Sequence, residues 1–292
     1  VESTRDKGGL RFTGCYLIRC DKGLSISQEI YVSNLNEIDI SEIKNMKRDE
    51  PLPPLHQAAF RSAVASAAWA TQRVALCDMF NVNCLTSKAD KATLEDVFLI
   101  NKTIRRLKHD PQRLFLPKFS VPFSSCRILV ISDSSHGIRA QGCFLILLTP
   151  DEDSNASVQP AHVLQSKSWK LKRVSVSTLS AEAQALVEAS NAAKFIQELI
   201  LQSMNVKLPI DLRSDHCGLV QHCNQLTSAL TDVRTELQIM VIKQNLGEQK
   251  DYRSLSHVTG DNNIADIGTV FPSRVEPAVR RLMEFGEIQN LG

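Results

Sequence analysis

Hydrophobic and polar residues form two kinds of pattern in the first 110 residues of the chain. Around an Asp-Lys-Gly turn at 21–23 they alternate with the period of a strand, which predicts a β-hairpin. After three closely spaced prolines the apolar residues recur at helical spacing, and Thr93 and Asp96 are placed to form a capping box. The predicted elements are strands 9–19 and 24–32 and helices 56–81 and 93–108. This part of the chain is therefore predicted to contain both strands and helices.

From residue 126 onwards, strand-like and helix-like patterns follow one another. Apolar runs rich in β-branched residues predict strands, and apolar residues at a spacing of three to four predict helices. The predicted strands are 126–133, 141–148, one within 160–170, 208–215 and 252–258, and the predicted helices are 178–202, 216–224, 231–245, one from about 262, and 276–285. This order predicts an α/β fold on a mixed sheet, not a barrel or a sandwich. The proline-containing stretch 109–124 is the expected domain boundary.

Composition and charge narrow the classes of function. The 292 residues favour two domains, and no apolar run approaches the roughly 18–20 residues that a membrane span requires. A net charge of +2 gives no overall attraction to nucleic acid, so a polyanion would have to bind locally basic stretches. The eight cysteines are scattered without a Cys-x-x-Cys pair, which favours reduced intracellular thiols over a zinc site. Because the chain begins at Val1, we expect it to be a piece of a longer product.

Four carboxylates lie at the ends of predicted elements. Asp133 and Asp215 end two strands, Glu182 lies in the first turns of the long helix 178–202, and Asp266 starts a late helix. Taken singly, an acid in a turn or at a helix N-terminus needs no functional explanation. If the two strands are neighbours, however, the four acids converge at one edge of the sheet and repel one another unless cations lie between them. Oxygen ligands suit Mg²⁺ or Mn²⁺, and two such ions can activate water against a phosphodiester.

Short motifs around these acids carry a resemblance to a known family. They are Ser132-Asp-Ser-Ser135, residues 174–185, Arg213-Ser-Asp-His216, residues 230–234 and residues 257–266. In this order, residues 126–270 resemble the ribonuclease H domain of copia-type retrotransposon polyproteins. The preceding part resembles the end of the same elements' reverse transcriptase, at residues 12–14, 26–31, 60–69 and 92–97.

The resemblance implies a fold and a domain organisation. It implies a ribonuclease H-like mixed sheet flanked by helices, preceded by an α+β remnant of the reverse-transcriptase connection or thumb. The expected domains are a reverse transcriptase C-terminal segment of palm end or thumb-like kind at 1–115, a ribonuclease H-like domain at 125–275, and a C-terminal helix and tail at 276–292.

The resemblance also implies a function: metal-dependent endonuclease cleavage of the RNA strand of RNA–DNA hybrids. It places the catalytic, metal-binding acids at Asp133, Glu182, Asp215 and Asp266, with two Mg²⁺ or Mn²⁺ ions. Basic residues that would contact the hybrid backbone are Lys170, Lys172 and Arg173, and Ser134 and Ser135 could form hydrogen bonds near the first acid. The implied partners are the hybrid and the upstream palm and fingers of the same polyprotein, without a membrane. The expected location is intracellular, in the cytoplasm, a virus-like particle or the nucleus.

Departures from the family pattern keep other interpretations open. The polymerase's paired-aspartate turn is absent, so the chain should not synthesise DNA alone. Ile267-Gly-Thr269 stands where the family has Leu-Thr-Lys, and His216 stands where Asn is common. A decayed or domesticated module that binds nucleic acid or protein without catalysis is therefore an alternative. An integrase or transposase nuclease shares strand-end acids, but the long helix after the third strand and the motif at 262–266 argue against it.

Overall fold

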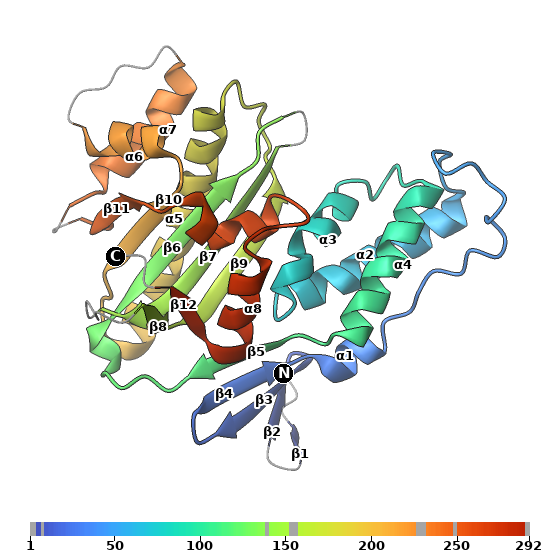
Figure 1. Ribbon diagram of the computed structural model, residues 1–292, viewed down its shortest axis with the longest axis horizontal. Coiled ribbons are helices and arrows are strands. Elements are labelled where there is room, and N and C mark those ends of the chain that lie inside the picture. Colours follow the sequence, from blue (N-terminus) through green and yellow to red (C-terminus); the bar gives the residue numbers. More distant parts are fainter. Residues whose placement is uncertain are drawn as a thin grey trace. The chain divides into compact units, whose positions relative to one another are not determined.

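The computed structural model describes residues 4–6, 9–137, 140–151, 157–225, 232–247 and 250–289. The chain divides into two compact units, Val1–Phe115 and Leu116–Gly292 (Figure 1). Among the described residues, no helix combines the length and the hydrophobicity that a membrane crossing requires.

The first unit combines a small sheet with a cluster of helices (Figure 1). The strands are β1 Thr4–Asp6, β2 Gly9–Phe12, β3 Cys15–Cys20, β4 Gly23–Ser27 and β5 Arg113–Pro117, which runs across the boundary of the units, and they lie in the order β1-β2-β3-β4-β5. The helices are α1 Glu29–Ser33, α2 Pro54–Thr71, α3 Met79–Thr86 and α4 Leu94–His109, with a 3₁₀ turn at Leu76–Asp78. Fully buried apolar side chains of these helices, such as Phe60 and Ile100, form the core.

Helix α4 begins as predicted, whereas the predicted helix 56–81 is wrong beyond Thr71. The capping box of α4 is present, with the Thr93 backbone N–H donating to Asp96 at 3.0 Å. Helix α2 ends early because the backbone N–H groups of residues 73, 74 and 75 all donate to the Ala70 carbonyl, which turns the chain away from the helix axis. The separate helix α3 then follows from Met79.

Both strands of the predicted hairpin are shorter than expected. Thr13 and Gly14, with φ of 47° and 80°, form a turn that divides the predicted strand 9–19 into β2 and β3. The predicted strand 24–32 is wrong after Ser27, because the Ser27 hydroxyl accepts from the Glu29 N–H at 3.2 Å and the chain continues as helix α1.

The second unit is built on a five-stranded mixed sheet (Figure 1). Its strands are β6 Cys126–Ser134, β7 Gln141–Pro150, β9 His162–Lys170, β10 Ile210–Ser214 and β11 Ser254–His257, in the order β11-β10-β6-β7-β9. Strand β7 is antiparallel to β6 and β9, and β10 is parallel to β6 and β11. This sheet order, with helices packed on the sheet, confirms the predicted ribonuclease H-like mixed α/β fold.

Helices and short elements complete the second unit. The helices are α5 Thr178–Met204, α6 Cys217–Asn224, α7 Val233–Gln244 and α8 Glu276–Phe285, with 3₁₀ turns at Phe123–Ser125, Gly260–Asn262 and Ile264–Gly268. Strands β8 Val158–Pro160 and β12 Glu287–Gln289 pair with each other and were not predicted, because three residues are too few to show an alternation. This pairing holds α8 and the described part of the C-terminal tail within the same unit. The predicted start of a helix at 231, the motif residues 230–231 and the tail residues 290–292 lie outside the described residues.

The helix predicted from about 262 is wrong, since two short 3₁₀ turns stand in its place. The buried side chain of Asn263 accounts for the difference. Its amide donates to the Ser132 carbonyl and to Asp133 on β6, which ties the chain to the strand at the point where a helix would begin. Tertiary hydrogen bonds therefore override the local helical pattern.

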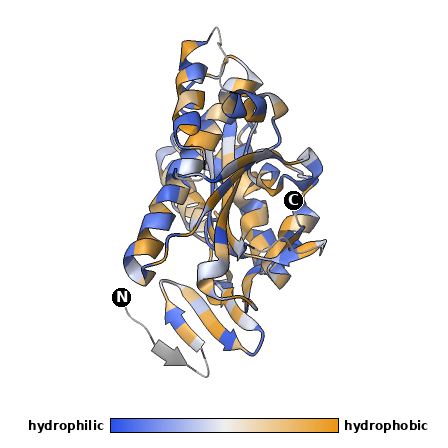
Figure 2. Ribbon diagram, turned by 90° about the vertical axis from the view of Figure 1, so that its left-hand side faces the viewer, coloured by the Kyte–Doolittle hydropathy of each residue, from blue (hydrophilic) through white to orange (hydrophobic). Residues whose placement is uncertain are grey.

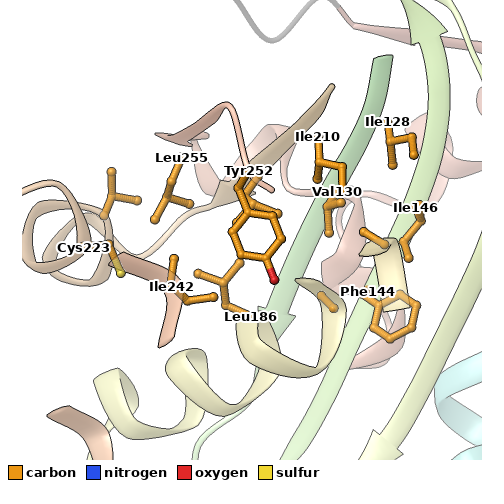
Figure 3. Close-up of a cluster of buried hydrophobic side chains, with 14 of the residues drawn as sticks. Ile128, Val130, Phe144, Ile146, Leu186, Ile210, Cys223, Ile242, Tyr252 and Leu255 are labelled. Atoms are coloured by element: carbon orange, nitrogen blue, oxygen red, sulfur yellow. The ribbon is translucent and has the colours of Figure 1, made fainter. Parts of the chain in front are cut away.

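Strand β6 is covered on both faces, so its side chains are held rigidly. Ile128 and Val130 belong to the core on the face of α5, which Figure 3 shows together with Leu186, Ile242 and Tyr252. Residues 129 and 131, which point to the opposite face, are also fully buried. Figure 2 shows that hydrophobic and hydrophilic residues are interspersed along the helices.

Candidate metal centre

The register between β6 and β10 brings two of the predicted acids together. Ser132 of β6 pairs with Ser214 of the parallel strand β10. The next residue along the chain is an aspartate in both cases, Asp133 within β6 and Asp215 directly after β10, so the two acids lie at the same edge of the sheet. Asp133 is only 6% exposed, whereas Asp215 is half-buried and therefore lies nearer to solvent.

Helix α5 delivers the third acid, Glu182. The helix begins where the Ser177 hydroxyl accepts from the Ser180 N–H at 3.1 Å, and Glu182 follows within the next turn. Glu182 Oε1 accepts from both the backbone N–H and the hydroxyl of Ser134, at 3.0 and 2.8 Å. Its second oxygen, Oε2, is buried and has no hydrogen-bond partner among the described residues. A buried carboxylate oxygen of this kind is an open ligand position.

These three acids form one cluster. Asp133, Glu182 and Asp215 each offer a carboxylate oxygen, and the three oxygens lie within 4.8 Å of one another. Asp266, the fourth predicted acid, lies outside this group of three, in the 3₁₀ turn Ile264–Gly268, and accepts from the Ser273 hydroxyl at 2.7 Å. The role of Asp266 as a metal ligand stays a prediction.

The electrostatics of the cluster favour a bound cation. Burial raises the pKa of Asp133 to about 7; the hydrogen bond from Thr269 opposes the rise, and the charges of Asp215 and Asp266 add to it. Burial, followed by the charge of Asp133, raises the pKa of Glu182, and the hydrogen bonds from Ser134 act against this. A divalent cation would remove the penalty of keeping these acids ionised. An all-oxygen donor set with a buried, unpartnered oxygen fits Mg²⁺ or Mn²⁺.

Two residues that orient Asp133 were not predicted. The Asn263 amide donates to Asp133 Oδ1 at 2.9 Å, and the Thr269 hydroxyl donates to Oδ2. Both oxygens of this buried acid are therefore held in a fixed direction. In the sequence, Asn263 lies within the motif at 257–266 and Thr269 ends the departure at 267–269, but neither was predicted to contact Asp133.

Two histidines near Asp215 contact backbone atoms of the chain. His216 Nδ1 accepts from the Leu219 N–H at 3.0 Å and so caps helix α6. His257 Nε2, on β11, lies 3.1 Å from the Asp215 carbonyl oxygen. Both contacts hold the backbone around Asp215 in place and so fix the position of its carboxylate.

The predicted nucleic-acid-binding residues lie at two places. The Ser135 N–H donates to the Gln141 carbonyl, and its hydroxyl accepts from the Gln141 N–H, both at 2.9 Å, so Ser135 closes the connection between β6 and β7. Lys170 ends β9, and Lys172 and Arg173 follow it; all three basic residues are exposed. Their role in binding nucleic acid stays a prediction.

The raised pKa of Asp133 predicts how pH changes the stability of the metal-free protein. The folded-state value of about 7 lies above the ordinary value of 3.8, so between these values the folded state holds one proton more than the unfolded chain. Wild-type stability should fall as pH rises from about 4 to 7. Asp133→Asn removes this penalty and should be more stable than wild type by about 2–4 kcal/mol at pH 8. Urea unfolding in EDTA from pH 4 to 8 measures the difference, and a difference that does not change with pH would contradict the prediction.

Comparisons with known proteins identify solved structures only. No protein-family model and no curated protein matches the chain. A ribonuclease H1 isolated from compost by a metagenomic approach is 15% identical, with 48% of this chain and 90% of that chain covered and a TM-score of 0.34. A structure of the same enzyme in complex with an RNA/DNA hybrid is 14% identical, with 47% and 88% covered and a TM-score of 0.31.

A longer match extends over both units. A foamy viral protease-reverse transcriptase in complex with dsDNA is 9% identical, with 86% of this chain covered and a TM-score of 0.24. This chain spans 45% of that protein's length.

Proposed function

We propose that the second unit is a metal-dependent endonuclease that cleaves the RNA strand of RNA–DNA hybrids. One observation carries the proposal: the carboxylates of Asp133, Glu182 and Asp215 converge within 4.8 Å at the edge of a rigid sheet, with a buried oxygen of Glu182 free to bind. Carboxylates in such proximity repel one another, so the arrangement favours an occupant that carries positive charge.

The three acids of the cluster would hold the metal, and the surrounding residues keep them in place. Bound Mg²⁺ or Mn²⁺ would supply an activated water and stabilise the leaving oxygen of a phosphodiester. Ser134 fixes one oxygen of Glu182, which leaves the other directed to the cluster. Asn263 and Thr269 hold both oxygens of Asp133. We further propose two ions, with Asp266 as an additional ligand.

The choice of substrate follows from the sequence resemblance of residues 126–270. An RNA–DNA hybrid presents 2′-hydroxyl groups in a wide minor groove, which distinguishes it from duplex DNA. Lys170, Lys172 and Arg173, exposed at the end of β9, would contact its phosphates. Ser135 closes the turn beside the cluster and so presents Ser134 to Glu182.

The same resemblance supports a wider proposal for the whole chain. The first unit would be the C-terminal segment of a copia-type reverse transcriptase, and the upstream palm and fingers of the polyprotein would be its partner. The protein would then act inside the cell, where the element is reverse-transcribed.

Cleavage of a labelled RNA–DNA hybrid by the purified chain tests the proposed activity. Single-stranded RNA, duplex RNA and duplex DNA serve as comparison substrates, each with Mg²⁺, with Mn²⁺ and with EDTA. We expect the RNA of the hybrid to be cut only when metal is present. A folded chain that binds the hybrid without cutting it would contradict the enzyme proposal and favour the decayed or domesticated binding module.

A further inference from the structure

Arg274 lies beside the acidic cluster, on the segment 269–275, which supplies one hydroxyl group to the cluster and one to the neighbouring Asp266. Thr269 donates to Asp133 and Ser273 donates to Asp266, and Arg274 follows directly. Burial raises the pKa of Asp133, and the positive charge of Arg274 acts against that rise. The guanidinium group is therefore close enough for its field to reach the buried acid.

Gly260 provides the space in which the Arg274 side chain lies. A Cβ atom added to Gly260 would come within 2.4 Å of Arg274 Nη2, and the same position is 3.5 Å from Asp215 Oδ2. The guanidinium thus lies against the backbone of residue 260, on the side where Asp215 stands. Any other residue at 260 would displace it.

The ion pair that Arg274 makes in the structure is a weak one. Arg274 Nη1 is 3.3 Å from Asp261 Oδ1, and the two side chains are 59% and 84% exposed. An exposed pair of this kind contributes little, because water and salt screen both charges. The guanidinium can therefore exchange Asp261 for an anion that it binds better. A phosphodiester is such an anion, since its two oxygens match the planar fork of an arginine.

We propose that Arg274 is a substrate-contacting residue whose guanidinium, lying against Gly260, binds a backbone phosphate of the nucleic acid beside the acidic cluster. The inference rests on the proposed function and adds a residue to it. The cluster's negative charges repel a phosphate backbone, and a cation at its rim offsets this repulsion.

Arg281 offers a matched control for Arg274. Both arginines line the same cavity of about 320 Å³, together with Asp261, Ile264 and other residues. Arg281 is bound to Glu287 through Nε and Nη2, at 3.1 and 2.8 Å. Removing Arg281 changes the net charge of the cavity lining as much as removing Arg274 does. It leaves Arg274, whose charge acts on Asp133, in place.

Steady-state cleavage of the hybrid by four variants tests the role of Arg274. Arg274→Ala should raise KM about ten-fold while kcat stays within about three-fold, because the lost contact is a binding contact. Arg274→Lys should recover part of the loss, and Gly260→Ala should raise KM several-fold without any change of charge. Arg281→Ala should change KM less than two-fold. An unchanged KM in Arg274→Ala, or an equal rise in Arg281→Ala, would overturn the inference.

A binding measurement separates this inference from the proposed activity. Fluorescence anisotropy gives the dissociation constant of the labelled hybrid with Ca²⁺ in place of Mg²⁺, at several salt concentrations. Arg274→Ala should weaken binding about ten-fold and reduce the slope of log affinity against log salt by about one. If the chain cuts nothing but binding still depends on Arg274 and not on Arg281, the activity is refuted and this inference is supported. A hybrid that does not bind, or binds all variants equally, refutes the inference.

Discussion

Replacing Asp133 with asparagine is expected to reduce metal-dependent cleavage of the hybrid by about a thousand-fold or more while the chain stays folded. The change removes a negative ligand oxygen from a cluster whose three oxygens lie within 4.8 Å of one another. Loss of an outer-shell partner of a metal ligand typically costs about 10–100-fold in affinity or activity, so loss of the ligand itself should cost more. Asparagine keeps the size of the side chain and retains one oxygen to accept from Asn263 or Thr269.

Single-turnover cleavage and calorimetric titration with Mn²⁺ measure this effect on chemistry and on metal binding separately. Glu182→Gln should behave like Asp133→Asn, because it removes the charge beside the buried, unpartnered oxygen. Glu198→Gln is the matched control: it makes the same chemical change on the same helix at an exposed position, and it should leave both quantities within two-fold. If Asp133→Asn retained cleavage within ten-fold of wild type, the cluster would not be the catalytic site.

The positions of Asp133 and Asp215 could be predicted because the signal for each is local. A run of β-branched residues that ends on an aspartate predicts a strand and the edge at which its last side chain lies. Their distance from each other could not be predicted in this way, since it depends on the pairing of Ser132 with Ser214, more than 80 residues later in the chain. The sequence resemblance, not the hydrophobic pattern, placed the acids in one site.

The orienting residues could not be predicted, because their contacts join distant parts of the chain. Asn263 and Thr269 reach Asp133 across 130 and 136 positions of sequence. The helical pattern from about 262 was misleading for the same reason: the hydrogen bonds that hold this segment run to β6 and not along a helix. Similarly, nothing in the small residues of the predicted helix 56–81 indicated that three N–H groups would converge on the Ala70 carbonyl.

The second large expected effect is on the stability of the fold. It concerns Asp211, which lies near the opposite end of β10 from Asp215. Asp211 is 2% exposed and accepts from Arg253 Nε at 2.9 Å, from Arg253 Nη2, and from the Ser254 hydroxyl at 2.7 Å. Arg127 Nη1 lies 3.4 Å away, and Arg253 also makes two hydrogen bonds to Asp151, at 2.8 and 2.7 Å. Burial acts to raise the pKa of Asp211, but the hydrogen bonds from Arg253 and Ser254 and the charges of Arg253 and Arg127 outweigh it and lower the pKa.

Asp211→Ala is therefore expected to lower the free energy of unfolding by about 3–5 kcal/mol at pH 7, because it leaves the buried guanidinium of Arg127 without its carboxylate. Urea unfolding measures the change, and Glu188→Ala is the control: its pair with Lys167 is 49% and 43% exposed, so its loss should cost at most about 1 kcal/mol. Since the folded-state pKa of Asp211 is lowered, its contribution to stability is present above the ordinary value of 3.8 and is lost as pH falls below it. The difference between wild type and Asp211→Asn should therefore shrink only in strong acid. If Asp211→Ala lowered the free energy of unfolding by less than 1 kcal/mol, the prediction would be wrong, and the Asp211 carboxylate would not be needed for the stability of the sheet.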